Sequence, residues 1–392
     1  MPSVSHVDLA NSRYIEAARN LDPLHADALC RAAREMNSQE DVHGLAVALR
    51  RINPALEEVA GYSVQESLAA MRDLGLFLGS LKRHGVEPVE AVPEVAPVLL
   101  ALGARTGMVP RDTVHHYTTW NPPGERQRMY TGDPQEGHLQ ESVRMVFPKL
   151  RDGLELCDRL SGTEIEDPGF ALLVDELAEH LGAMVDCIDL VVGKVSPVFF
   201  ARTLRPYFED VTVDGTAFLG PAAAQAPLWL IDLALWASDR SAPEYAAFLA
   251  DSIPYSLPRW RELYSRWLTA PSVVTRLVTA LGRYQDGPAE LPTALRAGAE
   301  ALARALRVVV VFRGRHLGIA RKAYEADLRL YPVGSGGASV DLLREILDLT
   351  RENLVLSRPR TPAAPATPDH GTPTSAVGLL PKQRNRASEV AR

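Results

Sequence analysis

Residues 295–324 read LRAGAEALARALRVVVVFRGRHLGIARKAY and decide the fold of the C-terminal half of the chain. Apolar side chains recur there every three or four residues, which predicts one long amphipathic helix. His316 lies fourteen residues after Leu302, so we expect its imidazole to point to the apolar side. A neutral imidazole is a strong ligand for iron, which makes His316 a candidate metal ligand. The alternative is a core histidine that is hydrogen-bonded to a backbone carbonyl.

Helical periodicity also governs the rest of the chain. Two further apolar stripes are Leu68, Met71, Leu74, Leu78 and Leu81, and Leu172, Leu177, Leu181, Met184, Ile188 and Val191. Alternating β-branched runs are scarce, and only residues 211–218, around Gly215, suit a short hairpin. The apolar run 226–236 indicates a buried helix. The sequence therefore predicts an all-α fold.

Composition limits the classes of function. The chain has 392 residues, 46% of them hydrophobic and 23% charged, with a formal net charge of -7. An acidic chain without a basic face disfavours nucleic acid as a partner. Cys30, Cys157 and Cys187 show no close pairing, which favours a reducing cytoplasm. We expect neither a leader peptide nor a membrane span, because no basic start and no run of about 20 apolar residues occurs.

The ends of the chain differ from its middle. Residues 1–16 are weakly patterned, and residues 357–392 are rich in proline and threonine, with no apolar stripe that would offset the entropy of ordering. We therefore expect a weakly ordered N-terminus, one folded domain over residues 17–356 and a disordered tail.

A glycine-rich turn comes after the long helix. Gly334-Ser335-Gly336-Gly337 precedes Ser339, which has the character of a helix N-cap. Backbone N–H groups, the Ser335 hydroxyl and a positive helix end would together favour a substrate carboxylate. The alternative is a plain Gly-Ser loop.

Two more side chains are candidates for the site. Arg313 lies one turn before His316 and suits an acidic group at the edge of a cofactor, although a solvated basic helix end is equally compatible with its position. Trp120, which comes after His115, His116 and Tyr117, is a candidate for stacking on an aromatic substrate. His115 and His116 are adjacent and so cannot both face one metal ion.

The chain resembles the monodechloroaminopyrrolnitrin synthase family over roughly residues 20–355. The family belongs with the tryptophan and indoleamine 2,3-dioxygenases. The matching segments are Ala70-Met71-Arg72-Asp73, residues 77–85, Thr119-Trp120-Asn121-Pro122, Tyr130-Thr131-Gly132, His138-Leu139 with residues 141–144, Phe312-Arg313 with His316-Leu317, Tyr324-Glu325 and residues 334–337. The tail and the linker 326–333 depart from the family pattern.

The resemblance implies a single-domain helical bundle that encloses a haem. It implies that His316 is the axial ligand of haem b and that Arg313 also contacts the cofactor. It places Tyr324 and Ser335 in the catalytic pocket, where Trp120, Gly336 and Gly337 would help to bind the substrate. Tyr324 would donate or relay a proton, and Ser335 would bind the amino-acid carboxylate.

The reaction that the resemblance implies is a haem-dependent oxidative rearrangement of tryptophan or 7-chlorotryptophan to an aminophenyl-pyrrole, in pyrrolnitrin (antibiotic) biosynthesis, with dioxygen or a related oxidant. Another haem-dependent aromatic amino-acid oxygenase, a dioxygenase or a hydroxylase, and a non-catalytic haem-binding protein are the alternatives. The electron donor and a homodimer stay open.

Overall fold

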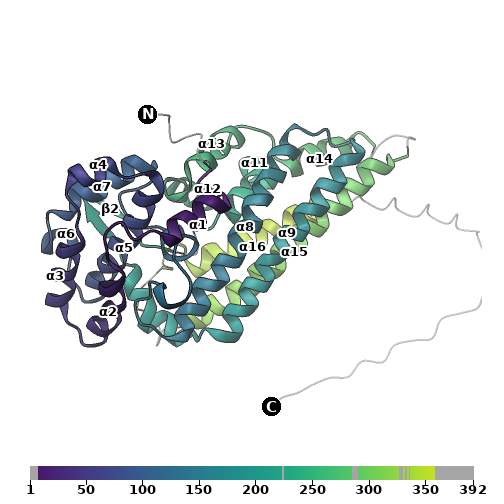
Figure 1. Ribbon diagram of the computed structural model, residues 1–392. Coiled ribbons are helices and arrows are strands. Elements are labelled where there is room, and N and C mark those ends of the chain that lie inside the picture. Colours follow the sequence, from purple (N-terminus) through teal and green to yellow (C-terminus); the bar gives the residue numbers. More distant parts are fainter. Residues whose placement is uncertain are drawn as a thin grey trace, which may run out of the picture. The chain divides into compact units, whose positions relative to one another are not determined.

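The computed structural model describes residues 8–222, 225–284, 290–325, 330–331, 333–334 and 336–357 (Figure 1). The described chain is helical apart from one small hairpin, which confirms the all-α class. The helices of the first half are α1 (Ser12–Asn20), α2 (Asp27–Ser38), α3 (Val42–Ile52), α4 (Leu56–Gly61), α5 (Val64–Arg83), α6 (Pro88–Ala91), α7 (Val95–Thr106), η2 (His115–Thr119), η3 (Gly124–Arg126), α8 (Pro134–Gly162) and α9 (Pro168–Lys194). Those of the second half are η4 (Phe199–Leu204), η5 (Arg205–Phe208), α10 (Leu228–Asp232), η7 (Leu233–Ala237), α11 (Ser238–Arg240), α12 (Pro243–Ser252), η8 (Ile253–Tyr255), α13 (Pro258–Trp267), α14 (Val273–Gly282), α15 (Thr293–Ala323) and α16 (Val340–Leu356).

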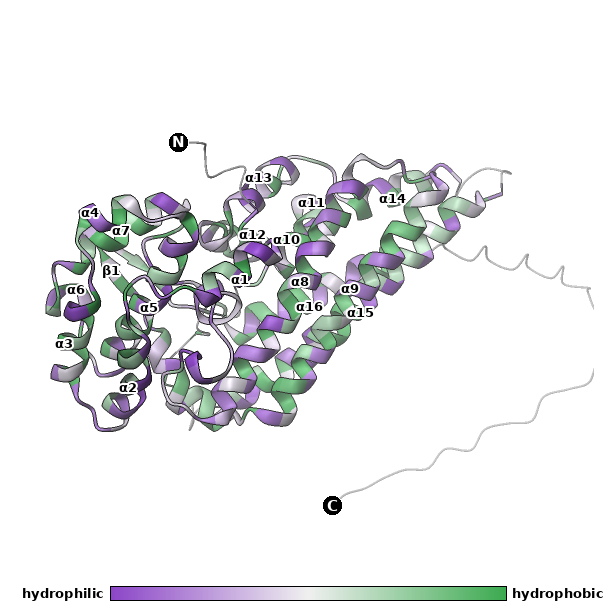
Figure 2. Cartoon of the chain, in the orientation of Figure 1, coloured by the Kyte–Doolittle hydropathy of each residue, from purple (hydrophilic) through white to green (hydrophobic). Residues whose placement is uncertain are grey.

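The long helices α8 and α9 of the first half pack together with α15 and α16 of the second half. The helix α9 packs against both α8 and α15, and α15 also packs against α16 (Figure 1). Each of these helices carries both apolar and polar residues (Figure 2). Their apolar sides join the larger of the two hydrophobic cores, because burying those sides removes them from water.

The second core surrounds α5, which is buried along most of its length. A capping box fixes the start of α5: the Ser63 hydroxyl accepts from the Glu66 amide, and the Glu66 carboxylate accepts from the Ser63 amide. The helix ends at Arg83, and Gly85, two residues later, has a φ of +73°. A glycine in this left-handed conformation is a common end of a helix.

The predicted hairpin is confirmed. Strands β1 (Val211–Val213) and β2 (Thr216–Phe218) pair antiparallel, with Val211 opposite Phe218, across a turn at Asp214 and Gly215. Both of these turn residues have positive φ, as a two-residue hairpin turn requires.

Three segments, η2, η4 and η7, are π-helical. The run predicted as one buried helix over residues 226–236 is thus α10 continued by the π-helical η7. Such wide turns are rare and are found mostly near functional sites.

The stripe predictions succeed with one exception. The stripe of α5 is buried, as are Leu177, Leu181, Met184 and Ile188 of α9, and Val191 is half-buried, whereas Leu172 is 71% exposed, so its assignment to the core is wrong. Leu172 lies in the second turn of α9, where the apolar spacing of the stripe continues. No described element covers its side chain there.

A buried ion network joins α5 to the loop after η2. The Asp73 carboxylate accepts from Arg72 Nε at 2.8 Å and from Arg128 Nε at 2.7 Å, and Arg128 also reaches Asp27 at 2.6 Å. Asn121 secures the same loop, because its side chain bonds the backbone of Tyr117 and Arg128. The Arg-Asp and Thr-Trp-Asn-Pro motifs thus stabilise the fold around this loop.

Candidate active site

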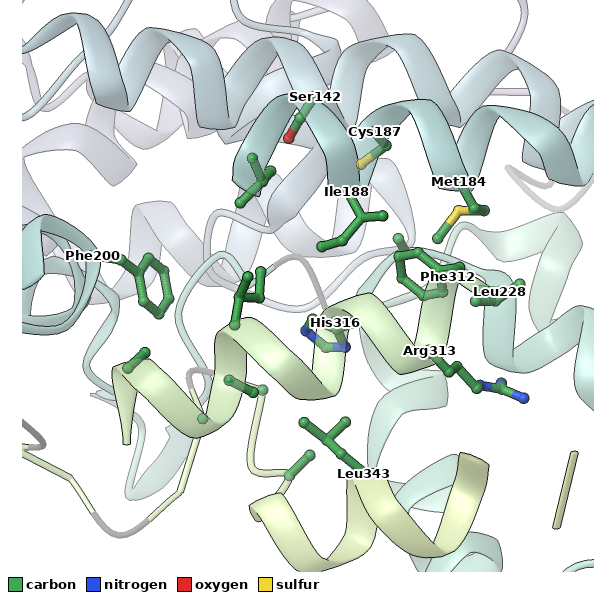
Figure 3. Close-up of a pocket in the computed structure, with 18 of the residues that line it drawn as sticks. Ser142, Met184, Cys187, Ile188, Phe200, Leu228, Phe312, Arg313, His316 and Leu343 are labelled. Carbon is green, nitrogen blue, oxygen red and sulfur yellow. The ribbon is translucent and has the colours of Figure 1, made fainter. Parts of the chain in front are cut away.

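An apolar cavity of about 300 Å³ lies among α8, α9, α15 and α16, with α10 and α12 completing its wall. Met184, Cys187 and Ile188 project from α9 toward the segment of α15 that carries Phe312 and His316, and Leu343 lies on the α16 side (Figure 3). This volume is at the lower end of the range for small-molecule sites, and such sites are mostly apolar with a few polar groups.

His316 lines the cavity from α15. Its ring stacks on that of Phe312, with the centroids 5.7 Å apart and an angle of 13° between the planes. Among the described residues, neither ring nitrogen has a hydrogen-bond partner. The alternative from the sequence was a core histidine hydrogen-bonded to a backbone carbonyl. Within the described residues, His316 makes no such bond.

Burial and, to a smaller extent, the positive charge of Arg313 lower the pKa of His316 to about 4. The imidazole is therefore neutral near pH 7. A neutral ring with an available nitrogen that faces an apolar cavity fits the axial position of a haem. The residues present thus suit the cofactor that the resemblance implies.

Arg313 also lines the cavity wall, but its guanidinium extends away from His316 (Figure 3). It donates to the Asp232 carboxylate of α10 and to the Thr350 hydroxyl of α16. Arg313 is 8% exposed, so it is a buried ion-pair partner and not part of a solvated helix end. A contact from Arg313 to a cofactor stays a prediction.

Asp232 joins several parts of the cavity wall. Besides Arg313, its carboxylate accepts from the Tyr245 hydroxyl at 2.5 Å and from Trp236 Nε1 at 3.1 Å. Burial and the charge of Asp232 both raise the pKa of Tyr245 well above its usual value, so the phenol stays protonated as a donor. Sequence reasoning missed Asp232, although a single acid inside the apolar run 226–236 was a usable signal.

Tyr324 comes directly after the last residue of α15 and lines the cavity. Its hydroxyl donates to the carbonyl of Val333 at 3.2 Å. Burial raises the pKa of Tyr324, although the charge of Arg205 opposes that shift, so the phenol keeps its proton near pH 7. The hydroxyl is thereby available as a proton donor.

The glycine-rich turn lies beside Tyr324. Gly334 and Gly336 line the cavity, and Gly337 has a φ of +84°, a conformation that glycine adopts without strain. The amide of Gly334 donates to the carbonyl of Ala338, and Ser339 caps α16 as predicted. Ser335 lies outside the described residues.

Trp120 is not among the residues that line this cavity. It is fully buried at the end of η2, with ring centroids 5.2 Å from His115 and 4.7 Å from His116. The structure therefore brings His316, Arg313, Tyr324, Gly334 and Gly336 to one cavity and places Trp120 in a neighbouring aromatic cluster. Its role in substrate binding stays a prediction.

Burial lowers the pKa of His115 to about 3 and lowers that of His116 as well. Both rings are therefore neutral, and neither lines the cavity.

The fold and this cavity define a helical protein in which the neutral imidazole of His316 faces an apolar pocket. A sequence model of the family described as monodechloroaminopyrrolnitrin synthase PrnB matches residues 11–361. The chain belongs to this family, whose members are haem-dependent oxygenases of pyrrolnitrin biosynthesis that act on a substrate derived from an aromatic amino acid. No described helix has the length and the apolar character that a membrane span requires.

Proposed function

We propose that His316 binds the iron of a haem b in this cavity and that the enzyme converts tryptophan or 7-chlorotryptophan to an aminophenyl-pyrrole. One observation carries the proposal: a neutral imidazole faces an apolar cavity, and no described residue bonds to its nitrogens. When bound, the haem would supply the redox chemistry that opens the indole, with dioxygen or a related oxidant as co-substrate.

The chain's own residues bind and orient the amino acid. The apolar side chains of α9 and α16 exclude water and suit an indole ring. Tyr324 Oη holds a proton at the turn end of the cavity, where it can donate to the substrate. Ser335, together with the backbone of Gly336 and Gly337, would accept the carboxylate, and Trp120 would shape the pocket from the neighbouring cluster.

Arg313 positions the ligand helix. Its bonds to Asp232 and Thr350 tie α15 to α10 and α16, so the imidazole one turn away is held in a fixed place. We also propose that Arg313 contacts the cofactor, through guanidinium N–H groups that the ion pair with Asp232 leaves available to an acidic group.

The test is a spectrum of the purified chain reconstituted with haem. The wild-type chain and the surface control His43→Ala should show the same Soret band, and His316→Ala should lose it or shift it strongly. Product analysis with tryptophan, 7-chlorotryptophan and tyrosine then separates the rearrangement from hydroxylation or simple ring cleavage. A reconstituted chain without a haem band, or a full band in His316→Ala, contradicts the proposal.

Two alternatives give different results in the same assay. Another aromatic amino-acid oxygenase would form a hydroxylated or ring-cleaved product, and a haem carrier would bind the cofactor without saturable tryptophan binding. We favour the rearranging enzyme because the cavity has a proton donor and a glycine-rich turn beside the imidazole.

We also place the protein in the cytoplasm, since Cys30, Cys157 and Cys187 are all free thiols. The electron donor and a homodimer remain to be determined, the latter by sedimentation of the full chain.

A further inference from the structure

Glu136, in the first turn of α8, is a fully buried carboxylate. Its oxygens accept from the amides of Tyr130 and Thr131, from the Thr131 hydroxyl and, at 3.0 Å, from the Tyr117 hydroxyl. Within the part of the chain that the structure describes, it forms no ion pair. Neutral donors therefore hold a carboxylate that burial has taken out of water.

The other buried acids of the described chain are paired differently. Asp73, Asp112 and Asp232 each form an ion pair with an arginine, whereas Glu136 has a phenol in that place. Burial raises the pKa of Glu136, although its hydrogen bonds oppose that shift, so this carboxylate binds a proton more readily than an ordinary glutamate. Of its donors, the phenol of Tyr117 is the most acidic and is the one that can release a proton to it.

The Tyr117 ring belongs to a stack of three tyrosines. Its centroid lies 5.7 Å from that of Tyr130, and the centroid of Tyr130 lies 4.5 Å from that of Tyr207, with angles of 26° and 20° between the planes. The three side chains are buried. At the outer end, the guanidinium of the half-buried Arg83 lies 6.0 Å from the centroid of the Tyr207 ring. Stacked rings thus connect Arg83 with the phenol that bonds the buried carboxylate.

The inner end of the stack lies near the cavity around His316. Glu136 precedes Leu139 by three residues on α8, so both side chains are on the same side of the helix, and Leu139 lines the cavity. Burial and the charge of Glu136 both raise the pKa of Tyr117 well above its usual value, so the phenol does not ionise by itself. A tyrosine that loses an electron becomes a strong acid, and Tyr117 then has its proton acceptor already in contact.

We propose that Tyr117 is a redox-active tyrosine that gives up one electron while its proton moves to Glu136. The O–H bond of Tyr117 breaks, an O–H bond forms on Glu136 Oε1, and the electron passes to a one-electron oxidant at the cavity. The product is a neutral tyrosyl radical beside a neutral carboxyl group. A one-electron reductant such as ascorbate, acting through the rings of Tyr207 and Tyr130, then reduces the radical, and Glu136 returns the proton. This inference goes beyond the proposed function, because it assigns a redox role to residues outside the cavity.

The experiment forms the radical in two ways. The full chain loaded with haem is treated with hydrogen peroxide and frozen, and the haem-free full chain is illuminated with ruthenium tris-bipyridine and persulfate before freezing. Electron paramagnetic resonance then records organic radicals, and stopped-flow absorption follows their formation. The variants are Tyr117→Phe and Glu136→Gln. The matched control is Tyr245→Phe, which removes a phenol bonded to Asp232, an acid already paired with Arg313.

Wild type and the control should give a tyrosyl signal, and Tyr117→Phe should lose most of it. Glu136→Gln should form the radical roughly 100-fold more slowly, as loss of a positioned proton acceptor predicts. An undiminished signal in Tyr117→Phe, or an unchanged rate in Glu136→Gln, overturns the proposal. Loss of the signal in Tyr245→Phe overturns it as well, because the radical would then lie on the wrong tyrosine.

A further measurement does not depend on the folding of the variants. In the wild-type chain, ring-deuterated tyrosine should narrow the signal, and heavy water should slow its formation, because the transferred proton exchanges with solvent. A signal that narrows with ring-deuterated tryptophan instead contradicts the proposal.

The two ways of forming the radical separate this inference from the proposed function. A wild-type chain that binds no haem contradicts the proposed function alone, since the illuminated chain needs none. A wild-type chain that gives no tyrosyl signal under illumination, or none with haem bound and peroxide added, contradicts the assignment of Tyr117.

Discussion

The ion network around Asp73 and the cavity around His316 differ in whether their buried polar groups have hydrogen-bond partners. In the network, Asp73 is fully buried between two guanidiniums at hydrogen-bond distance, and the loop that carries Arg128 is held by Asn121. In the cavity, the imidazole of His316 has no hydrogen-bond partner among the described residues. The motifs of the first region therefore maintain the fold, whereas the unpaired imidazole is the group to which our proposal assigns ligand binding.

The largest effect should come from Asp73→Ala. This change leaves Arg72 and Arg128 buried beside each other without their carboxylate, which should cost about 3–5 kcal/mol of unfolding free energy. Urea denaturation measures the loss. The exposed pair of Arg304 and Asp175 is the control, because Asp175→Ala should cost no more than about 1 kcal/mol. Equal losses in the two variants would show that the network is not a special source of stability.

The same carboxylate should make the protein sensitive to acid. Burial opposes ionisation of Asp73, but the charges and hydrogen bonds of Arg72 and Arg128 outweigh it and hold its pKa below the usual value. A depressed carboxyl pKa contributes stability that is present above the unfolded value, about 3.9, and is lost as the pH falls through the folded value. Denaturation at a series of pH values should show this loss in wild type below about pH 4 and a smaller loss in Asp73→Asn.

Tyr324→Phe tests the boundary of the cavity. It removes the hydrogen bond to the Val333 carbonyl and should lower the unfolding free energy by about 1 kcal/mol. Turnover should fall more than haem binding does, because the proton donor is lost while His316 is untouched. An unchanged turnover rate would remove Tyr324 from the mechanism.

The smallest effect on folding should come from His316→Leu in the ligand-free chain. The imidazole has no described hydrogen-bond partner to lose, so the unfolding free energy should change by no more than about 0.5 kcal/mol. The haem absorption band should nevertheless disappear. A large loss of stability would place His316 with the structural groups of the network.

Local pattern predicted much of this molecule. Helical spacing predicted α5, α9 and α15, and Ser339 predicted the start of α16. The position of His316 on the apolar side of α15 also comes from spacing alone. The assignment of residues 17–356 to one domain stays a prediction.

Long-range pairing could not be predicted in this way. Arg313 pairs with the carboxylate of Asp232, which is 81 residues away in the sequence. No periodic pattern in the sequence indicates this pairing. The prediction that Leu172 is buried was wrong for a related reason. An apolar stripe does not show how far the helices that pack against it extend.

The π-helical turns of η4 and η7 have a consequence for protein engineering. Each accommodates one residue more than an ordinary turn, so removing a single residue there would restore regular winding and rotate the next segment of the chain by about 100°. Shortening η4 would rotate η5 relative to the cavity wall that Phe200 lines, and shortening η7 would move Trp236 off Asp232. One-residue deletions at these two places are thus a way to reorient a cavity wall while leaving every remaining side chain as it is.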